Sequence, residues 1–139
     1  GDRNHTLWGG FVVLGKGERV YFAGDTGYGP HFTQIAERLG PPSVALLPIG
    51  AFKPRWLMRD RHMSPRDALL AMQDLKANET LVMHYGVFEL ADDGQREPLD
   101  ELAHALGESP ALAPNVHVVP FGQAWRKTET GETQNGAIP

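Results

Sequence analysis

Hydrophobic residues recur along the chain in two kinds of pattern, short β-prone runs and sets at helical spacing. The β-prone runs predict five strands, which lie over residues 6–14, 19–23, 44–47, 80–83 and 116–119. The helical sets predict three helices, which lie over residues 32–39, 65–77 and 99–106. The turn Gly15-Lys16-Gly17-Glu18 joins the first two strands in a hairpin, and the last strand can continue to Trp125 through a kink at Pro120 and Gly122.

These elements follow one another as hairpin, helix, strand, helix, strand, helix, strand. Strands that alternate with helices predict an α/β layer whose inner strands are buried and whose helices cover one face. The second helix has the clearest start signal, with Ser64 as N-cap, Pro65 at the first helical position and Asp67 in capping-box position. A chain of 139 residues is expected to form one domain.

Composition then narrows the classes of function. Hydrophobic residues make up 41% of the chain, and no apolar run approaches the roughly 20 residues of a membrane helix. With 13 basic and 17 acidic side chains the net charge is −4, so no basic field indicates a nucleic-acid partner. There is no cysteine, which leaves His, Asp and Glu as the strong metal ligands. We expect a soluble, cytoplasmic protein, and peripheral contact with a membrane stays open.

Two residues with metal-binding side chains follow buried strands. Asp25 lies in the glycine-rich turn after residues 19–23, and His84 comes directly after residues 80–83. Both side chains could emerge at the same edge of an α/β sheet, where a carboxylate and an imidazole suggest a site for a divalent ion such as zinc. Two ligands alone bind such an ion weakly. The alternatives are a turn-forming Asp25 and a buried His84 that is satisfied by the backbone.

A long connection, residues 51–63, separates the third strand from the capped helix. Its length suggests a functional role. It contains His62, which is a candidate general acid, oxyanion donor or third ligand, or else a solvated side chain. Its aromatic and basic part could contact an anionic, partly apolar ligand. The alternative is a loop that folds back on the core with Trp56 and Leu57 as anchors.

Other chemistry has weaker support. The remaining histidines, which we expect to be structural or exposed, are His5, His31, His104 and His117. The chain has no nucleophile elbow, no Walker loop and no dinucleotide-binding fingerprint. Serine hydrolase, nucleotide-binding and nicotinamide-binding functions are therefore not indicated.

Several motifs, taken together, resemble one family in order and spacing. They are Leu7-Trp8-Gly9-Gly10-Phe11, Phe22-Ala23-Gly24-Asp25-Thr26-Gly27-Tyr28, Pro48-Ile49-Gly50-Ala51-Phe52, Pro54-Arg55-Trp56, His62 before the Pro65 helix, and His84-Tyr85-Gly86. The set is similar to the metallo-β-lactamase-fold hydrolases, in the branch of N-acyl-phosphatidylethanolamine-hydrolysing phospholipase D and its bacterial relatives. The similarity runs from about residue 7 to residue 88, and more loosely to about residue 126.

This resemblance implies a metal site and a reaction. In the family, a binuclear zinc centre is bridged by the Asp that corresponds to Asp25 and is ligated by the His that corresponds to His84. The His before the proline-started helix, here His62, assists catalysis. The implied function is metal-dependent hydrolysis, in which a metal-bound hydroxide attacks a phosphodiester of a phospholipid or another phosphate or ester substrate.

The sequence also departs from the family pattern. The His-x-His-x-Asp-His motif, which supplies most of the metal ligands, is absent from the chain. Lys53 stands where relatives often carry an acid, and Tyr85 stands where Trp is common. The resemblance implies the second half of an αββα sandwich, with one mixed sheet and helices on one face. We expect residues 1–126 to be this C-terminal half and residues 127–139 to be a polar, disordered tail.

Several expectations follow if the chain is only the C-terminal half of an αββα sandwich. The chain alone should be inactive and should bind zinc weakly or not at all. It should form a homo-oligomer or associate with an N-terminal half through the exposed sheet face. Two alternatives to the phospholipase-D-like hydrolase stay open, namely a non-catalytic binding or assembly domain of the same fold and a hydrolase that resembles sugar-phosphate lactonases.

Overall fold

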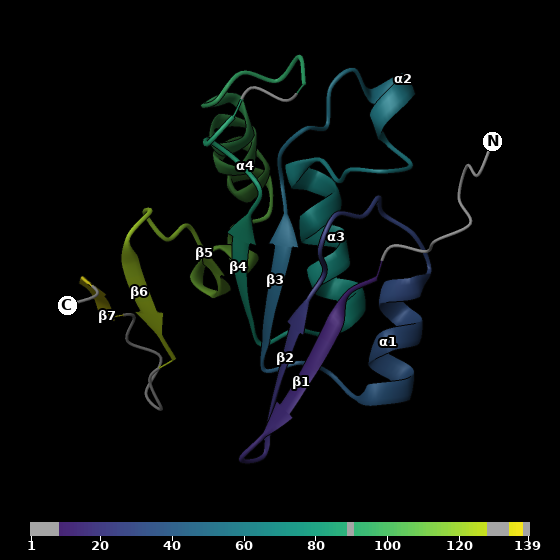
Figure 1. Ribbon diagram of the computed structural model, residues 1–139, viewed down its shortest axis with the longest axis vertical. Helices are drawn as coiled ribbons and strands as arrows, with labels where there is room; N and C mark the ends of the chain where they lie inside the picture. The colour runs from purple at the N-terminus through teal and green to yellow at the C-terminus, as the bar shows by residue number, and fades with distance from the viewer. Residues whose placement is uncertain (1–8, 89–90, 128–133, 138–139) are drawn as a thin grey trace.

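The structure is a computed structural model that describes residues 9–88, 91–127 and 134–137. Its main feature is a five-stranded sheet in the order β1-β2-β3-β4-β5 (Figure 1). The strands are β1 (Phe11–Gly15), β2 (Glu18–Phe22), β3 (Val44–Pro48), β4 (Glu79–Met83) and β5 (Val116–His117). β1 is antiparallel to β2, and β2 to β5 are parallel. The sheet is therefore mixed, as predicted.

Three helices cover one face of this sheet (Figure 1). They are α1 (His31–Leu39), α3 (Pro65–Leu75) and α4 (Glu97–Glu108). α3 packs on β3 and lies between α1 and α4. Side chains such as Leu47 and Leu75 are fully buried between these layers, because strand residues alternate between the two faces and every second one points towards the helices. The predicted α/β layer with helices on one face is confirmed.

The start of α3 follows the predicted capping pattern. The Ser64 hydroxyl accepts a hydrogen bond from the Asp67 amide at 3.2 Å, and the Asp67 carboxylate accepts one from the Ser64 amide at 3.0 Å. The two bonds satisfy amides that the first turn of a helix leaves without partners. The helix axis, and with it the residues just before Ser64, is fixed in position.

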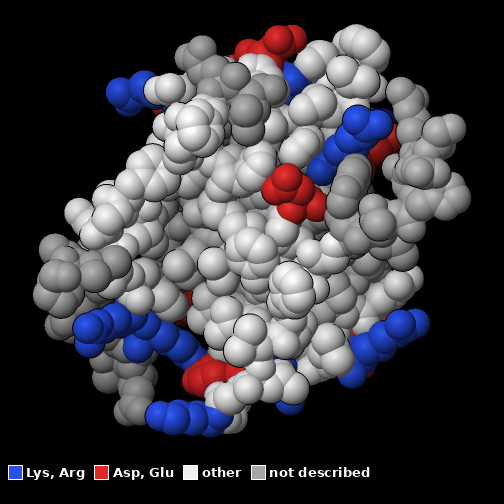
Figure 2. All heavy atoms as spheres, viewed as in Figure 1, with Lys and Arg blue, Asp and Glu red and all other residues white. Residues whose placement is uncertain are grey.

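The other face of the sheet carries an apolar row. One residue from each strand stands in register across it: four are the apolar residues Phe11, Phe22, Leu46 and Leu81, and the fifth is His117. Phe11 is 68% exposed and Phe22 is 39% exposed. Figure 2, viewed from the same side as Figure 1, shows few charged side chains over the middle of the sheet. We call this surface the open sheet face.

The chain differs from the prediction after β5. A 3₁₀ helix (Pro110–Asn115) precedes β5, which ends at His117 and not at Val119. The predicted continuation to Trp125 is wrong, because β6 (Gln123–Arg126) pairs with β7 (Gln134–Ala137) in a separate two-stranded sheet. Pro120 has no amide to donate, and Gly122 adopts a φ of 78°, so the chain turns away from β4 between them.

Two other expectations concern the tail and the loop. The predicted tail at 127–139 contains β7, whereas residues 128–133 and 138–139 lie outside the described residues.

In the loop at 51–63, residues Arg55–Met58 form the short helix α2. Trp56 is 81% exposed, so Trp56 and Leu57 are not the anchors; Phe52 and Met63 are buried instead. Within the described part of the chain, no helix has the length and apolar character needed to cross a bilayer.

A tight turn joins β1 and β2. It lies at the end of the sheet opposite residues 23–25. Lys16 and Gly17 adopt φ angles of 49° and 80°, which are typical of a two-residue type I′ turn. The predicted hairpin is confirmed.

Candidate functional site

Asp25 and His84 lie close together at the carboxyl edge of the sheet. Asp25 follows β2 and His84 follows β4, and these parallel strands end at the same edge. Asp25 Oδ1 lies 3.3 Å from His84 Nε2, and the two side chains are 59% and 24% exposed. His84 has a φ of 61°, in the left-handed region that few residues other than glycine adopt. The backbone therefore turns sharply at His84 as the chain leaves β4.

Two glycines bring the surrounding loops into contact with this pair. A Cβ on Gly50 would overlap the His84 carbonyl oxygen and would lie 3.1 Å from the carbonyl carbon. A Cβ on Gly27 would lie 2.6 Å from the Arg59 carbonyl oxygen. Only glycine permits these approaches. The turn that carries Asp25 thus packs against the loop before His62, and the turn after β3 packs against His84.

His62 is the third predicted site residue, and the structure brings it to the same place. Its ring centroid lies 5.4 Å from that of His84. Its Nδ1 atom is buried and has no hydrogen-bond partner among the described residues. Burial, followed by repulsion from His84, lowers the pKa of His62 below its ordinary value. His62 is therefore neutral near pH 7 and can accept a proton next to His84.

Arg55, on α2, holds the backbone at His62. Its guanidinium donates a hydrogen bond to the His62 carbonyl at 3.1 Å and another to the Asp67 carboxylate at 2.6 Å. The same Asp67 carboxylate caps α3. The position of His62 is thus tied to the helix cap.

The separation of Asp25 and His84 fits a shared metal ion. Two donors that bind one tetrahedral zinc ion at about 2.0–2.1 Å lie roughly 3.3 Å apart, and the Oδ1–Nε2 distance is 3.3 Å. A carboxylate with an imidazole also suits the ligand preference of zinc. However, no cluster of three or more metal-binding side chains occurs in residues 9–88, 91–127 and 134–137. The described residues thus bring two candidate ligands together.

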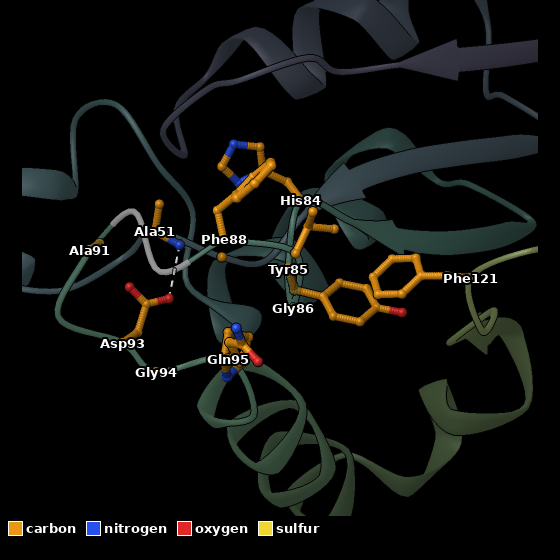
Figure 3. A pocket seen from close by; sticks show the side chains of 13 residues that line it. Ala51, His84, Tyr85, Gly86, Phe88, Ala91, Asp93, Gly94, Gln95 and Phe121 are labelled. Carbon is orange, nitrogen blue, oxygen red and sulfur yellow. Dashed lines mark hydrogen bonds between the residues drawn. The ribbon is translucent and has the colours of Figure 1, made fainter.

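Asp93 is a buried carboxylate near this site. It is 5% exposed and accepts hydrogen bonds from the Ala51 amide at 2.8 Å and the Lys53 amide at 3.4 Å. Figure 3 shows the bond to Ala51. Asp93 thus fixes the loop that follows Gly50. No sequence pattern distinguishes Asp93 from its exposed neighbour Asp92.

The other histidines lie away from Asp25 or have local partners. His117 Nε2 lies 2.7 Å from a Glu79 carboxylate oxygen, and His104 is on the exposed side of α4. His31 Nε2 lies 3.3 Å from the Thr26 hydroxyl, and burial lowers the pKa of His31. His104 and His117 have the exposed or structural positions that we predicted, whereas His31 lines the same pocket as Asp25. His5 lies outside the described residues.

Comparison with known proteins identifies the family. The model of the β-lactamase superfamily domain matches residues 1–85, which is more than half of the chain. N-acyl-phosphatidylethanolamine-hydrolyzing phospholipase D 1 of Caenorhabditis elegans is 34% identical over 131 residues, covering 92% of this chain and 37% of the relative. A UPF0173 metal-dependent hydrolase of Methanospirillum hungatei is 36% identical over 100 residues, covering 72% of this chain and 40% of the relative.

A solved structure agrees with these relatives. Igni18, a metallo hydrolase from the archaeon Ignicoccus hospitalis, matches with a TM-score of 0.57 and 29% identity, covering 99% of this chain and 49% of Igni18. The chain spans about 40% or less of the length of the two curated relatives above. It belongs to the β-lactamase superfamily and has the metallo-β-lactamase fold.

Proposed function

We propose that this chain is part of a zinc-dependent hydrolase in which Asp25 and His84 are metal ligands. The observation that carries the proposal is the 3.3 Å approach of Asp25 Oδ1 to His84 Nε2 at the carboxyl edge of the sheet. The binuclear centre needs further ligands, which residues outside this chain would supply in the complete protein. The chain alone is then inactive and binds zinc weakly.

The side chains of this site have separate roles in the proposed reaction. Zinc, when bound, acts as a Lewis acid that activates water and polarises the substrate oxygen. Asp25 and His84 would hold the metal through their carboxylate and imidazole groups. His62, kept neutral by burial, accepts or donates a proton beside His84 and stabilises charge that develops on the substrate. Arg55 keeps His62 in place through the His62 carbonyl.

The proposed substrate is a phosphodiester of the N-acyl-phosphatidylethanolamine type. The similarity to the Caenorhabditis elegans phospholipase D over 92% of this chain supports this choice.

One observation favours a second candidate, a non-catalytic binding or assembly domain. Only two metal-binding side chains lie close together in the described part of the chain. A domain that has the fold but binds no metal would show such an incomplete ligand set. A hydrolase of another ester, such as a sugar-phosphate lactone, is the third.

The complete natural protein should hydrolyse N-acyl-phosphatidylethanolamine in a zinc-dependent manner. We expect activity to disappear after treatment with a chelator and to return when zinc is added, because the metal provides the charge stabilisation. Product release is measured by mass spectrometry, with a sugar-phosphate lactone assayed in parallel. Hydrolysis of the lactone alone would support the third candidate, a sugar-phosphate lactone hydrolase. A protein that binds no zinc and hydrolyses neither substrate would support the binding domain.

The 139-residue chain by itself should self-associate through the open sheet face. An apolar face of this kind normally packs against a second layer. Sedimentation velocity should show oligomers for the chain, and fewer for Val13→Lys, which adds a charge to this face. Leu14→Lys is the matched control, since Leu14 is in the same strand and is similarly exposed (66% against 62%) but points to the opposite side. A monodisperse monomer for the unmodified chain would rule out this association.

A further inference from the structure

Two residues at the site, Ala51 and His84, have strained backbone conformations. Their φ angles are 59° and 61°, in the left-handed region that costs a residue other than glycine on the order of tenfold in its conformational equilibrium. Such conformations persist only where the surrounding structure fixes them. Gly50 precedes Ala51, and a Cβ on it would overlap the His84 carbonyl oxygen. The turn at residues 50–51 therefore packs directly against the backbone of His84.

The buried carboxylate of Asp93 holds this turn in place. Its two oxygens accept one backbone amide each, Oδ2 from Ala51 at 2.8 Å and Oδ1 from Lys53 at 3.4 Å. Figure 3 shows the bond to Ala51 and, on the neighbouring turn, His84. None of the ion pairs in the described part of the chain includes Asp93. Its charge is thus directed at backbone amides, which it orients.

Asp93 is itself fixed by its connection to α4. It lies four residues before Glu97, the first residue of that helix, and the helix is anchored in the core by the fully buried Leu102. Two further contacts join the same two segments. The Asp92 amide donates a hydrogen bond to the Lys53 carbonyl at 3.4 Å, and Lys53 Nζ forms an ion pair with Glu97. Asp93 therefore links a rigid helix to the turn at residues 50–51.

We propose that Asp93 is a positioning residue for the metal ligand His84. Its carboxylate keeps Ala51 in the left-handed conformation, and this keeps Gly50 against the His84 carbonyl. The backbone of His84 then directs the imidazole towards Asp25, 3.3 Å away. Without the carboxylate, the Ala51 amide would lose its partner and the residue would relax to negative φ. The inference rests on the proposed function, since it names the residue that holds one of the proposed ligands.

The test combines Asp93→Ala with Ala51→Gly in the complete natural protein, and zinc affinity is measured by competition with a chromogenic chelator. Asp93→Ala should lower zinc affinity about tenfold, as is typical when a group that orients a ligand is removed. Ala51→Gly alone should change it less than about twofold, because glycine adopts the left-handed conformation readily. For the same reason the double variant should return to within about threefold of the unmodified protein. A carboxylate that only stabilised the fold would give no such rescue.

A second measurement uses metal-free protein, so that it depends neither on zinc nor on hydrolysis. In protein with isotope-labelled histidine, NMR at one fixed pH records the ring signal of His84, which is assigned with His84→Ala. Asp93→Ala should shift or broaden this signal, and the double variant should restore it. The ring signal of His117, which lies on β5 and contacts Glu79, should not change in any of these variants.

Asp92→Ala is the matched control. Asp92 is the neighbouring carboxylate and is exposed, so its removal should change neither zinc affinity nor the His84 signal. Asp93→Asn, which keeps one acceptor oxygen, should lower zinc affinity about threefold, and it replaces Asp93→Ala if circular dichroism shows that the alanine variant does not fold. Equal effects of Asp92→Ala and Asp93→Ala, or a double variant no better than Asp93→Ala, would overturn the proposal.

The outcome is separable from that of the proposed function. A His84 signal that depends on Asp93 and is restored by Ala51→Gly, in a protein that binds no zinc, would keep the positioning role and refute the hydrolase. Zinc-dependent hydrolysis, with zinc affinity and His84 signal unchanged by Asp93→Ala, would keep the hydrolase and refute the role of Asp93.

Discussion

Replacing Asp25 by asparagine in the complete natural protein should lower kcat/KM for hydrolysis on the order of 10³-fold. The amide keeps the shape of the side chain but removes its negative charge, and a neutral group is a poor bridge between two cations. The zinc content of the purified variant, measured by elemental analysis, should fall together with activity. Both readings are needed, because loss of activity alone would not identify the metal site.

The matched control for this substitution is Asp60→Asn. Asp60 is an exposed carboxylate in the loop that packs against the turn of Asp25, so the control removes a nearby charge without removing a proposed ligand. We expect it to retain zinc and activity. His84→Ala should reproduce the Asp25→Asn result, and the double variant should add little, since ligands of one centre act as a unit. An Asp25→Asn protein with full zinc content and full activity would exclude Asp25 from the metal site.

Gly50→Ala should be the most destabilising single methyl addition at the site. The new Cβ would overlap the His84 carbonyl oxygen, which is backbone and cannot rotate away. Either β3 or the turn at His84 must shift, and we expect a cost of about 3 kcal/mol or more in the free energy of unfolding. Urea unfolding of the complete protein, followed by circular dichroism, measures this change.

Gly107→Ala is the control for this measurement, with the opposite expected sign. Gly107 lies in α4, and a Cβ there would have no atom within 4 Å. Alanine in a helix is favoured over glycine by about 1 kcal/mol, so this variant should be more stable than the unmodified protein. If Gly50→Ala were as stable as Gly107→Ala, the close approach of the Gly50 turn to His84 would not exist in solution.

The parts of the site that the sequence predicted depend on strand order alone. Asp25 and His84 follow strands that are parallel in one sheet, so their side chains emerge at one edge whatever the details of packing. The start of α3 can also be predicted from the sequence, because the capping box is a local pattern of Ser64, Pro65 and Asp67. These features need no information about distant contacts.

The parts that it missed depend on the direction of turns and on packing between distant segments. Trp56 and Phe52 are both aromatic and lie in one loop, but α2 turns Trp56 into solvent while Phe52 fills the core. Asp93 differs from Asp92 only in reaching the amides of Ala51 and Lys53, 42 and 40 residues away. The kink at Pro120 and Gly122 was predicted, but its direction, which takes β6 out of the five-stranded sheet, was not.

The hairpin turn at Lys16 and Gly17 offers a place to observe the protein without disturbing it. A five-residue strand such as β2 separates this turn from the turn of Asp25 by roughly 16 Å, and a Cβ on Gly17 would have no neighbour within 4 Å. A cysteine introduced at Lys16 would be the first thiol in a chain that has none. It would therefore accept one fluorophore at a single known position and report ligand or subunit binding from outside the site.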